Sequence, residues 1–426
     1  MLDAWAERLL QAQSPCDVVA LHVNDNFVAF LTGLRTKEGQ AVARFFGGRA
    51  GSAETIAAAS AISRLSECDD IHLRSCVTAG AAVIPVALAL DTHRDGDAFA
   101  RAVSAGYAAG LALGSSIGGA RALASGTWPS LLAAPLMAAV TASVLCGHDA
   151  ERLAHAMALA LAGSSGRPGR PEGSPSGRWY LFGEAVARGL SAADAAGAGF
   201  CGDLSLLSKS WLAGHTIPDA VDMSAFDAVP SSPSISDAGF KPFPIARQAA
   251  NALFAFRKIL AAGMDARRIR SVDVFVPAMN AGLLQRPLTP DDRLSRLSNM
   301  GFQFACAAFA PEALHDAERG VRPDLLEFAR LVTVRPTPDL EKQLPDRWAA
   351  RVAVVTPAGT VEETVVSTPF DADAPDLTQT LNEKWRSLTV RGYMAALFDA
   401  PFSHAMLWEE MAGRIGAAAR NEAPKD

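Results

Sequence analysis

Aromatic residues are scarce in this chain: they make up 7% of its 426 residues, although 50% of the residues are hydrophobic. A hydrophobic core of normal size therefore has to be built mainly from Ala, Leu and Val. The charged fraction of 20% is close to that of an ordinary globular protein. Because the chain is longer than a single core usually allows, we expect two domains.

An excess of positive charge is also missing. The formal net charge is −6, and no basic run of the kind that binds nucleic acids occurs. This balance argues against nucleic acid and against an anionic membrane surface as partners. The uncharged stretch 122–147 is long enough to cross a membrane, but it consists mainly of Ala, Ser, Thr and Gly and contains Pro129 and Pro135. We expect it to be a fully buried helix of a soluble bundle.

No C-x-x-C pair occurs among the six cysteines, which are scattered along the chain. This spacing argues against zinc, iron–sulfur and thioredoxin-like sites. In a chain of this size, scattered thiols are typical of buried residues in a reducing compartment. Residues 1–13 form an amphipathic pattern without the apolar core of a signal peptide. We therefore expect a cytoplasmic protein.

The motifs of several common enzyme classes are absent. No Walker phosphate-binding loop and no G-x-S-x-G elbow occurs, and the glycines of residues 114–119 do not follow a predicted strand as a dinucleotide-binding fingerprint would. Residues 163–177 contain five Gly and three Pro, which predicts a loop. This loop could be a flexible tether or a mobile active-site loop between two helices.

Four ionisable residues, Glu67, Asp69, Asp70 and His72, stand together before the uncharged run of residues 75–90. The run must be buried, and carboxylates with an imidazole at the mouth of a buried helix are costly to desolvate. Active sites accept this cost because burial and neighbouring charges tune proton affinity there. The simpler interpretation is a solvated helix cap, with Asp69 or Asp70 as the N-cap residue of the next element.

Helical patterns fill the chain up to about residue 229, and β-type segments first appear after the linker that follows. Strands are predicted at residues 271–276, 331–334, 349–356 and 361–367, the last two joined by a hairpin turn. Helices are predicted at residues 245–260, 293–309 and 324–330, and the helical pattern returns over residues 376–419. The expected fold class is therefore mainly α with an α+β lid. Its large all-helical domain spans residues 1–234 and 375–426, and its smaller α+β domain spans residues 235–374.

Short motifs along nearly the whole chain resemble those of one protein family. They lie at residues 57–72 (AAASAISRLSECDDIH), 79–90 (AGAAVIPVALAL), 104–114 (SAGYAAGLALG), 126–130 (GTWPS), 178–190 (RWYLFGEAVARGL), 199–203 (GFCGD), 240–252 (FKPFPIARQAANA) and 296–307 (RLSNMGFQFACA). In this order, and with an Ala-rich helix ending in GSSG, they resemble the MmgE/PrpD family. Its members include 2-methylcitrate dehydratase, cis-aconitate decarboxylase and iminodisuccinate epimerase.

The resemblance implies a large helical domain and a smaller α+β lid with a cleft between them, where the acidic cluster and the loop of residues 163–177 are expected to meet. It also implies a homodimer and neither a metal nor an organic cofactor. The implied substrates are small di- and tricarboxylates. The shared chemistry begins with removal of a proton from carbon next to a carboxylate or carbonyl, followed by elimination of water, loss of carbon dioxide or reprotonation on the other face.

Within the first part of the chain, the family's acidic pair is matched by Asp69 and Asp70, and its D-D-x-H form by His72. The histidine of the family's H-P-x-G motif is replaced by Thr78. An imidazole that could act as general acid or base is therefore missing at this position.

Further along the chain, Arg178 and Leu181 stand where the family has the Lys and His of K-x-L-H-x-G. The lid motif K-P-[YF]-P-x-x-R is kept from Lys241 to Arg247, but Gln248 begins the segment where the family has H-x-H. Two more imidazoles are thus absent, whereas the cationic equipment for binding an anion is kept.

On this basis we expect catalytic roles for Asp69, Asp70, His72, Arg178 and Tyr180. We expect substrate binding by Thr78, Lys241, Arg247 and Gln248, and no cofactor or metal. The structural alternatives are an interdomain salt bridge for Arg178 and Arg247 and a capping or buried hydrogen-bonded role for His72. The other histidines form no ligand spacing and are expected to be structural: His22, His93, His148, His155, His215, His315 and His404.

These features favour a cofactor-independent lyase or isomerase that acts on a small di- or tricarboxylate, with a dehydratase of the 2-methylcitrate type as the first hypothesis. An epimerase or decarboxylase with a specialised substrate competes, because epimerisation needs two opposed proton carriers but no acid on a leaving group. A second alternative is a non-catalytic descendant that keeps the fold and its anion pocket.

Overall fold

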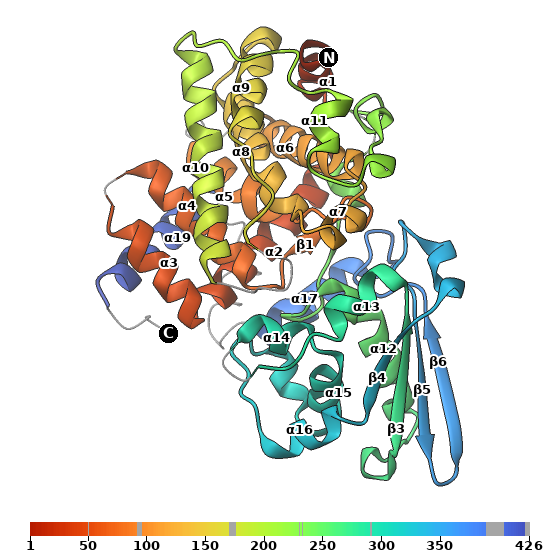
Figure 1. Cartoon of the computed structure of the whole chain (residues 1–426). Coiled ribbons are helices and arrows are strands. Elements are labelled where there is room, and N and C mark those ends of the chain that lie inside the picture. The colour runs from red at the N-terminus through yellow and green to blue at the C-terminus, as the bar shows by residue number, and fades with distance from the viewer. Residues whose placement is uncertain are drawn as a thin grey trace. The chain divides into compact units, whose positions relative to one another are not determined.

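The computed structural model describes residues 1–49, 51–91, 96–169, 176–229, 231, 233–289, 292–388 and 404–421 (Figure 1). The chain divides into two compact units. The helical unit comprises Met1–Gly239 together with Leu381–Asp426, and the mixed unit comprises Phe240–Thr380. The predicted fold class, mainly α with a smaller α+β part, is confirmed.

Most of the helical unit is made by the first half of the chain. Its helices are α1 (Leu2–Leu9), α2 (Cys16–Leu34), α3 (Lys37–Gly47), α4 (Ser52–Leu65), α5 (Gly80–Leu90), α6 (Gly96–Ser116), α7 (Ala120–Ala124), α8 (Pro129–Leu145), α9 (Ala150–Ala162), α10 (Gly177–Gly197) and α11 (Lys209–Ala213). Shorter elements are β1 (Asp70–Ile71) and the 3₁₀ turns η1 (Pro218–Ala220), η2 (Met223–Phe226) and η3 (Ile235–Asp237). Strand β2 (Gly239–Phe240) lies where the chain passes from one unit to the other.

Helix α8 lies among α5, α6, α9 and α10 (Figure 1). Its residues from Pro129 to Ser143 are all buried, so the prediction of a buried helix in this stretch is confirmed. Small residues allow the close packing: a Cβ atom at Gly106 of α6 would lie 2.2 Å from Thr141 Oγ1 of α8. Over the described ranges, the structure contains no helix with both the length and the apolar character needed to span a membrane.

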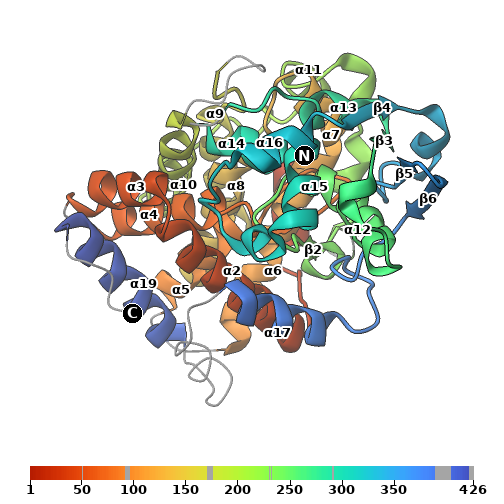
Figure 2. The same ribbon diagram turned by 90° about the horizontal axis from the view of Figure 1, so that it is seen from below.

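The C-terminal part of the chain packs onto the N-terminal helices. Helix α19 (His404–Ala419) lies beside α3 and also contacts α4 and α5 (Figure 2). Asp91 at the C-terminal end of α5 pairs with His404, with 3.0 Å between Oδ2 and Nδ1. The second half of α17 (Leu377–Leu388) also belongs to the helical unit and contributes Lys384 and Trp385, which bond to Asp25 of α2.

The mixed unit is built on a four-stranded sheet with the order β4–β3–β5–β6. Its strands are β3 (Ser271–Val276), β4 (Val332–Pro336), β5 (Ala350–Thr356) and β6 (Gly359–Val365). Strand β3 runs parallel to β4 and antiparallel to β5, and β5 and β6 form the predicted hairpin. Along β3 the buried residues alternate with half-buried ones, as expected for a sheet with one face on the core.

Helix α12 (Arg247–Ala261) packs along β5 and β6, and α15 (Met300–Phe309) packs on α12 and on α16 (Pro323–Ala329). The remaining short elements are α13 (Ala278–Leu284), α14 (Arg293–Ser298), η4 (Ala266–Arg268), η5 (Pro311–His315) and η6 (Pro338–Gln343). The prediction of one continuous helix over residues 293–309 is wrong. Asn299 has an extended backbone (ψ 116°) between α14 and α15, and its side chain caps α15 by accepting the Phe302 N–H at 2.8 Å.

The expectation of buried thiols is wrong for half of the cysteines. Cys68, Cys76 and Cys306 are buried, whereas Cys16, Cys146 and Cys201 are exposed. The exposed thiols all lie at the ends of helices or in a loop, where less of the chain covers a side chain. Cys16 is the first residue of α2, Cys146 follows α8, and Cys201 follows α10.

Candidate active site

The segment between α4 and α5 carries the acidic cluster in a constrained loop. The His72 N–H donates to the Val77 carbonyl at 2.9 Å, which closes the loop. Glu67 and Cys76 both have left-handed backbones, with φ of 56° and 55°. Such conformations cost energy for residues other than glycine and are concentrated at functional sites. The loop is held in place by this backbone bond and by contacts of its side chains.

Asp70 is the centre of these contacts. Its Oδ2 accepts a hydrogen bond from the Tyr107 hydroxyl of α6 at 2.5 Å and lies 2.9 Å from His22 Nδ1 of α2. Its Oδ1 accepts the N–H of Gly80, the first residue of α5, at 3.1 Å. Asp70 thus joins three helices and lies at the positive end of the α5 dipole.

The charge of Asp70 is strongly favoured in these surroundings. Burial raises the pKa of this carboxyl, but the hydrogen bond and charge of His22, the Tyr107 hydroxyl and the Gly80 N–H outweigh it, and the net pKa lies below the usual value. Burial and the Asp70 carboxylate raise the pKa of Tyr107 well above its usual value. Asp70 therefore carries the negative charge, and the neutral Tyr107 hydroxyl donates a hydrogen bond to it.

Gly80 leaves the room that this arrangement needs. A Cβ atom at this position would lie 2.8 Å from the Tyr107 hydroxyl and 3.1 Å from both carboxylate oxygens of Asp70. Any larger residue would push Tyr107 and Asp70 apart. The absence of a side chain at Gly80 therefore lets the first N–H of α5 bind the Asp70 carboxylate.

A buried ion pair lies next to this group. Lys384 Nζ bonds to Asp25 Oδ1 at 2.6 Å and to the Cys68 carbonyl at 2.7 Å. Trp385 Nε1 donates to the same Asp25 oxygen at 2.8 Å. Burial raises the pKa of Asp25 despite Lys384 and Trp385, and the charge of Asp70 acts in the same direction as burial.

Asp69, the neighbour of Asp70, pairs with Arg64 of α4, with 3.4 Å between Oδ1 and the guanidinium. The Arg64 guanidinium also lies over the rings of Trp128 and Trp179, at 5.2 and 5.8 Å from their centres. Arg178 lies over the same two rings, at 4.7 and 5.3 Å. Cation–π contact with a shared Trp pair therefore links Arg178 to the acidic segment.

The loop of residues 163–177 begins at this Trp pair. The Trp128 N–H donates to the Gly166 carbonyl at 2.7 Å, and a Cβ atom at Gly166 would lie 2.6 Å from Thr127 Cγ2. Residues 170–175 of the predicted loop lie outside the described residues, as does His93.

The other predicted residues of the helical unit have more local contacts. His72 is buried, with Nδ1 2.9 Å from Ser75 Oγ. The N–H and hydroxyl of Thr78 both bond to Ser130 Oγ at 3.1 Å. Tyr180 is exposed on α10, where its ring contacts Phe45 and Phe46 rather than the acidic residues.

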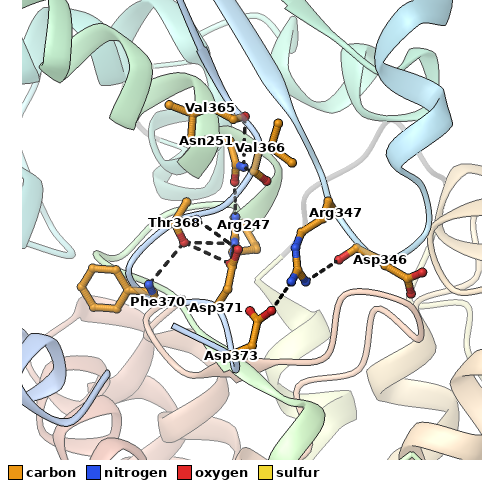
Figure 3. Close-up of polar contacts among 10 residues, drawn as sticks. All are labelled: Arg247, Asn251, Asp346, Arg347, Val365, Val366, Thr368, Phe370, Asp371 and Asp373. Atoms are coloured by element: carbon orange, nitrogen blue, oxygen red, sulfur yellow. Dashed lines mark hydrogen bonds and ion pairs between the residues drawn. The ribbon is translucent and has the colours of Figure 1, made fainter. Parts of the chain in front are cut away.

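In the mixed unit, Arg247 is the first residue of α12 and is 2% exposed. Its guanidinium bonds to Asn251 Oδ1 at 2.8 Å and Thr368 Oγ1 at 3.4 Å, and forms an ion pair with Asp371 (Figure 3). These contacts brace the mixed unit from within, whereas the structural alternative to substrate binding was a salt bridge between domains. Lys241 and Gln248 are buried in the same unit.

Both parts of the chain match known family models. Residues 15–222 match the MmgE/PrpD N-terminal domain, and residues 243–396 match the MmgE/PrpD C-terminal domain. The chain belongs to the MmgE/PrpD family. A search of curated proteins gave no match.

The MmgE/PrpD motifs drew attention to Asp69 and Asp70 but not to their partners. The sequence predicts a structural role for His22 and marks Tyr107 only as part of the family motif at residues 104–114. The signal was present for Tyr107, because a buried Tyr needs a partner for its hydroxyl. The sequence around His22, Asp25 and Lys384 gives no indication of the contacts that these residues make. Within the described residues, no group of three or more His, Cys, Asp or Glu side chains is arranged to hold a metal ion.

Proposed function

We propose that this MmgE/PrpD protein is a cofactor-independent lyase or isomerase that removes a proton next to a carboxylate of a small di- or tricarboxylate. Its family supports an enzyme of the dehydratase, lyase or isomerase type. The 2-methylcitrate type of dehydratase is the first candidate within this class. The observation that carries the proposal is the buried group of Asp70, His22 and Tyr107.

In this proposal His22 carries the proton. When the His22 imidazole is neutral and its Nδ1–H donates to Asp70, Nε2 is the ring nitrogen that can accept a proton. A carboxylate that fixes the tautomer and orientation of an imidazole is a recurring arrangement in enzymes that transfer protons. His22 would then supply the imidazole function that is absent at Thr78. Arg178 is the candidate in the helical unit for binding a substrate carboxylate, and Lys241 is the candidate in the mixed unit, whereas Arg247 is paired with Asp371.

Two other functions have support. An epimerase or decarboxylase of the iminodisuccinate or cis-aconitate type fits the absence of three family imidazoles, because neither reaction needs an acid on a leaving hydroxyl. A non-catalytic, anion-binding descendant fits the burial of Asp69, Asp70, His72 and Thr78, all of which have protein partners.

Hydrogen exchange in deuterated buffer tests the proposal. The protein is incubated with 2-methylcitrate, cis-aconitate and a panel of other di- and tricarboxylates, and deuterium incorporation and product formation are followed by NMR. We expect incorporation at carbon next to a carboxylate, loss of it in His22→Gln and Asp70→Asn, and normal exchange in the control Lys258→Met. Lys258 forms an exposed pair with Glu363 in the mixed unit.

The product separates the candidates: an alkene indicates a dehydratase, carbon dioxide a decarboxylase, and an inverted centre an epimerase. We expect exchange to survive exhaustive chelation. The absence of exchange with every compound, together with binding of one of them, would favour the non-catalytic descendant.

A further inference from the structure

Lys384 is one of the most deeply buried cations of the helical unit, with 1% of its side chain exposed. It comes from α17, and its ammonium bonds to Asp25 Oδ1 and to the Cys68 carbonyl at 2.6 and 2.7 Å. Both contacts are short and charge-assisted, which makes them strong hydrogen bonds.

The two partners of Lys384 lie on the two elements that carry the proposed proton-transfer group. Asp25 is three residues after His22 on α2, so the two side chains lie on the same face of that helix. Cys68 is two residues before Asp70 on the segment that leads into β1. The ammonium therefore ties together the elements that hold His22 Nδ1 and Asp70 Oδ2 at 2.9 Å.

Lys384 also supplies charge. Asp25 Oδ1 accepts from Lys384 and Trp385, whereas Asp25 Oδ2 has no hydrogen-bond partner within the part of the chain that the structure describes. Lys384 of α17 and Asp70 of β1 act on the pKa of Asp25, and His22 lies on the same helix. The charge of Asp25 also acts on Cys68, before β1, and on Tyr107 of α6. Without the ammonium, burial and the charge of Asp70 would still raise the pKa of Asp25, and the cation that opposes them would be lost.

We infer that Lys384 is a positioning residue that sets the spacing of His22 and Asp70 and supplies the cation that pairs with Asp25. Its effect on turnover rests on the proposed function, whereas its effect on the geometry and charge of the group does not. The proposed proton-transfer group therefore depends on the contact of α17 with Asp25 of α2.

Three variants test this inference. Lys384→Met removes the ammonium and keeps most of the stem, and Asp25→Asn with Lys384→Met removes both charges. Lys258→Met removes an exposed paired lysine and serves as the matched control. The first measurement is the melting temperature without ligand at about pH 6 and about pH 8.

In Lys384→Met the pKa of Asp25 rises further, so the folded state takes up a proton. A raised carboxyl pKa in the folded state means that stability is greater at low pH and is lost as the pH rises. The melting temperature of Lys384→Met should therefore fall further below that of the unmodified protein at the higher pH. The double variant should lack this difference. An equal deficit at both pH values in the single variant would overturn the charge part of the inference.

The second measurement is the ¹⁵N spectrum of the His22 imidazole in the ligand-free protein, assigned with His22→Gln. We expect the His22 resonances to change in both Lys384 variants and not in Lys258→Met. Unchanged resonances in both would overturn the positioning role. This result stands whether or not the protein turns over any polycarboxylate, so it is distinct from a failure of the proposed function.

The third measurement is steady-state turnover of the substrate found by exchange. Misplacement of a reacting group by about 1 Å can cost about a hundredfold in rate, so kcat should fall by about this factor in both Lys384 variants while KM changes little. The double variant should regain stability at high pH without regaining kcat. Recovery of kcat together with stability would show that Lys384 is merely structural.

Discussion

The buried carboxylates of Asp70 and Asp371 are alike in exposure but not in partners. Each is 4% exposed, one in the helical unit and one in the mixed unit. Asp371 pairs with Arg247, and its oxygens also accept the N–H and hydroxyl of Thr368 at 3.0 Å (Figure 3). Asp70 is bound by the imidazole of His22 and the phenol of Tyr107.

The difference lies in what can exchange a proton. A guanidinium stays protonated in proteins, so the Arg247–Asp371 pair holds a fixed charge and a fixed geometry. An imidazole, unlike a guanidinium, can lose a proton, which is why the proposed proton transfer is assigned to the His22–Asp70 pair. Burial alone therefore does not distinguish an ion pair that braces the fold from a pair that is proposed to transfer a proton; the chemistry of the partner does.

Removal of Arg247 should have the largest effect on stability. Arg247→Ala leaves Asp371 buried without its cation, and breaking a buried pair in this way typically costs about 3–5 kcal/mol of unfolding free energy. Arg335→Ala is the control, because Arg335 and Asp273 form an ion pair with side chains 53% and 31% exposed, for which less than about 1 kcal/mol is expected. Both values are measured by urea denaturation.

A different result would restore Arg247 as a substrate ligand. In that case Arg247→Ala would leave the unliganded stability nearly unchanged and weaken binding by roughly tenfold to a hundredfold, as loss of a charge-assisted hydrogen bond of about 1.5–3 kcal/mol implies. Arg247→Lys would recover only part of the affinity, because an ammonium cannot reproduce the planar fork.

Gly80→Ala should disrupt the contacts of Asp70 with His22 and Tyr107 without removing any of their polar atoms. The new Cβ atom would lie 2.8 Å from the Tyr107 hydroxyl, and overpacking of this kind costs about 1–3 kcal/mol. We therefore expect the unfolding free energy to fall by about 1–3 kcal/mol and deuterium exchange into the substrate to be lost. Gly282→Ala in α13 is the matched control, since a Cβ atom there has no neighbour within 4 Å, and the change should be neutral or stabilising by up to about 1 kcal/mol. Equal stability of the two variants would contradict the arrangement around Asp70.

The negative charge of Asp70 can also be tested by acid titration. The pKa of Asp70 is lowered in the folded protein, so its contribution to stability is present above the pKa of an unfolded aspartate and is lost as the pH falls through the folded value. Unfolding free energies measured by denaturant between about pH 6 and about pH 3 should therefore fall less steeply in Asp70→Asn than in the unmodified protein. Identical slopes would mean that Asp70 is not held as an anion.

The smallest expected effect is a difference in the rates at which the cysteines react with a thiol reagent. Burial raises the pKa of Cys68 to about 11 and that of Cys76 to about 12. In the native protein at about pH 8 a thiol reagent should label the three exposed cysteines first, with Cys146 slowed because burial and Asp194 raise its pKa. Mass spectrometry of the labelled peptides checks this order. Rapid labelling of Cys68 would indicate that the segment before β1 opens readily.

The sequence predicted the elements well where a signal is local. The β5–β6 hairpin, the return to helix near the C-terminus and the burial of α8 follow from periodicity, turn residues and the absence of charge. The break at Asn299 was missed because hydrophobic residues continue across it and only the capping side chain marks the boundary.

The site was predicted only in part, for a physical reason. Asp70 was found because it stands in a conspicuous acidic cluster, but its partners His22 and Tyr107 are 48 and 37 residues away in the chain. A lone His on an apolar helix gives no sign of which carboxylate it will meet. Contacts of this kind depend on how the helices pack, which a pattern within one helix does not encode.

The partnership of Lys384 with Asp25 has a consequence for synthesis of the protein. The two residues are 359 positions apart, and the mixed unit lies between them in the chain. At about 5–20 residues per second, tens of seconds pass on the ribosome between the appearance of the carboxylate and that of its cation. Until then the N-terminal helices lack the cation of Asp25. The ion pair can form only after the whole of the mixed unit has been made.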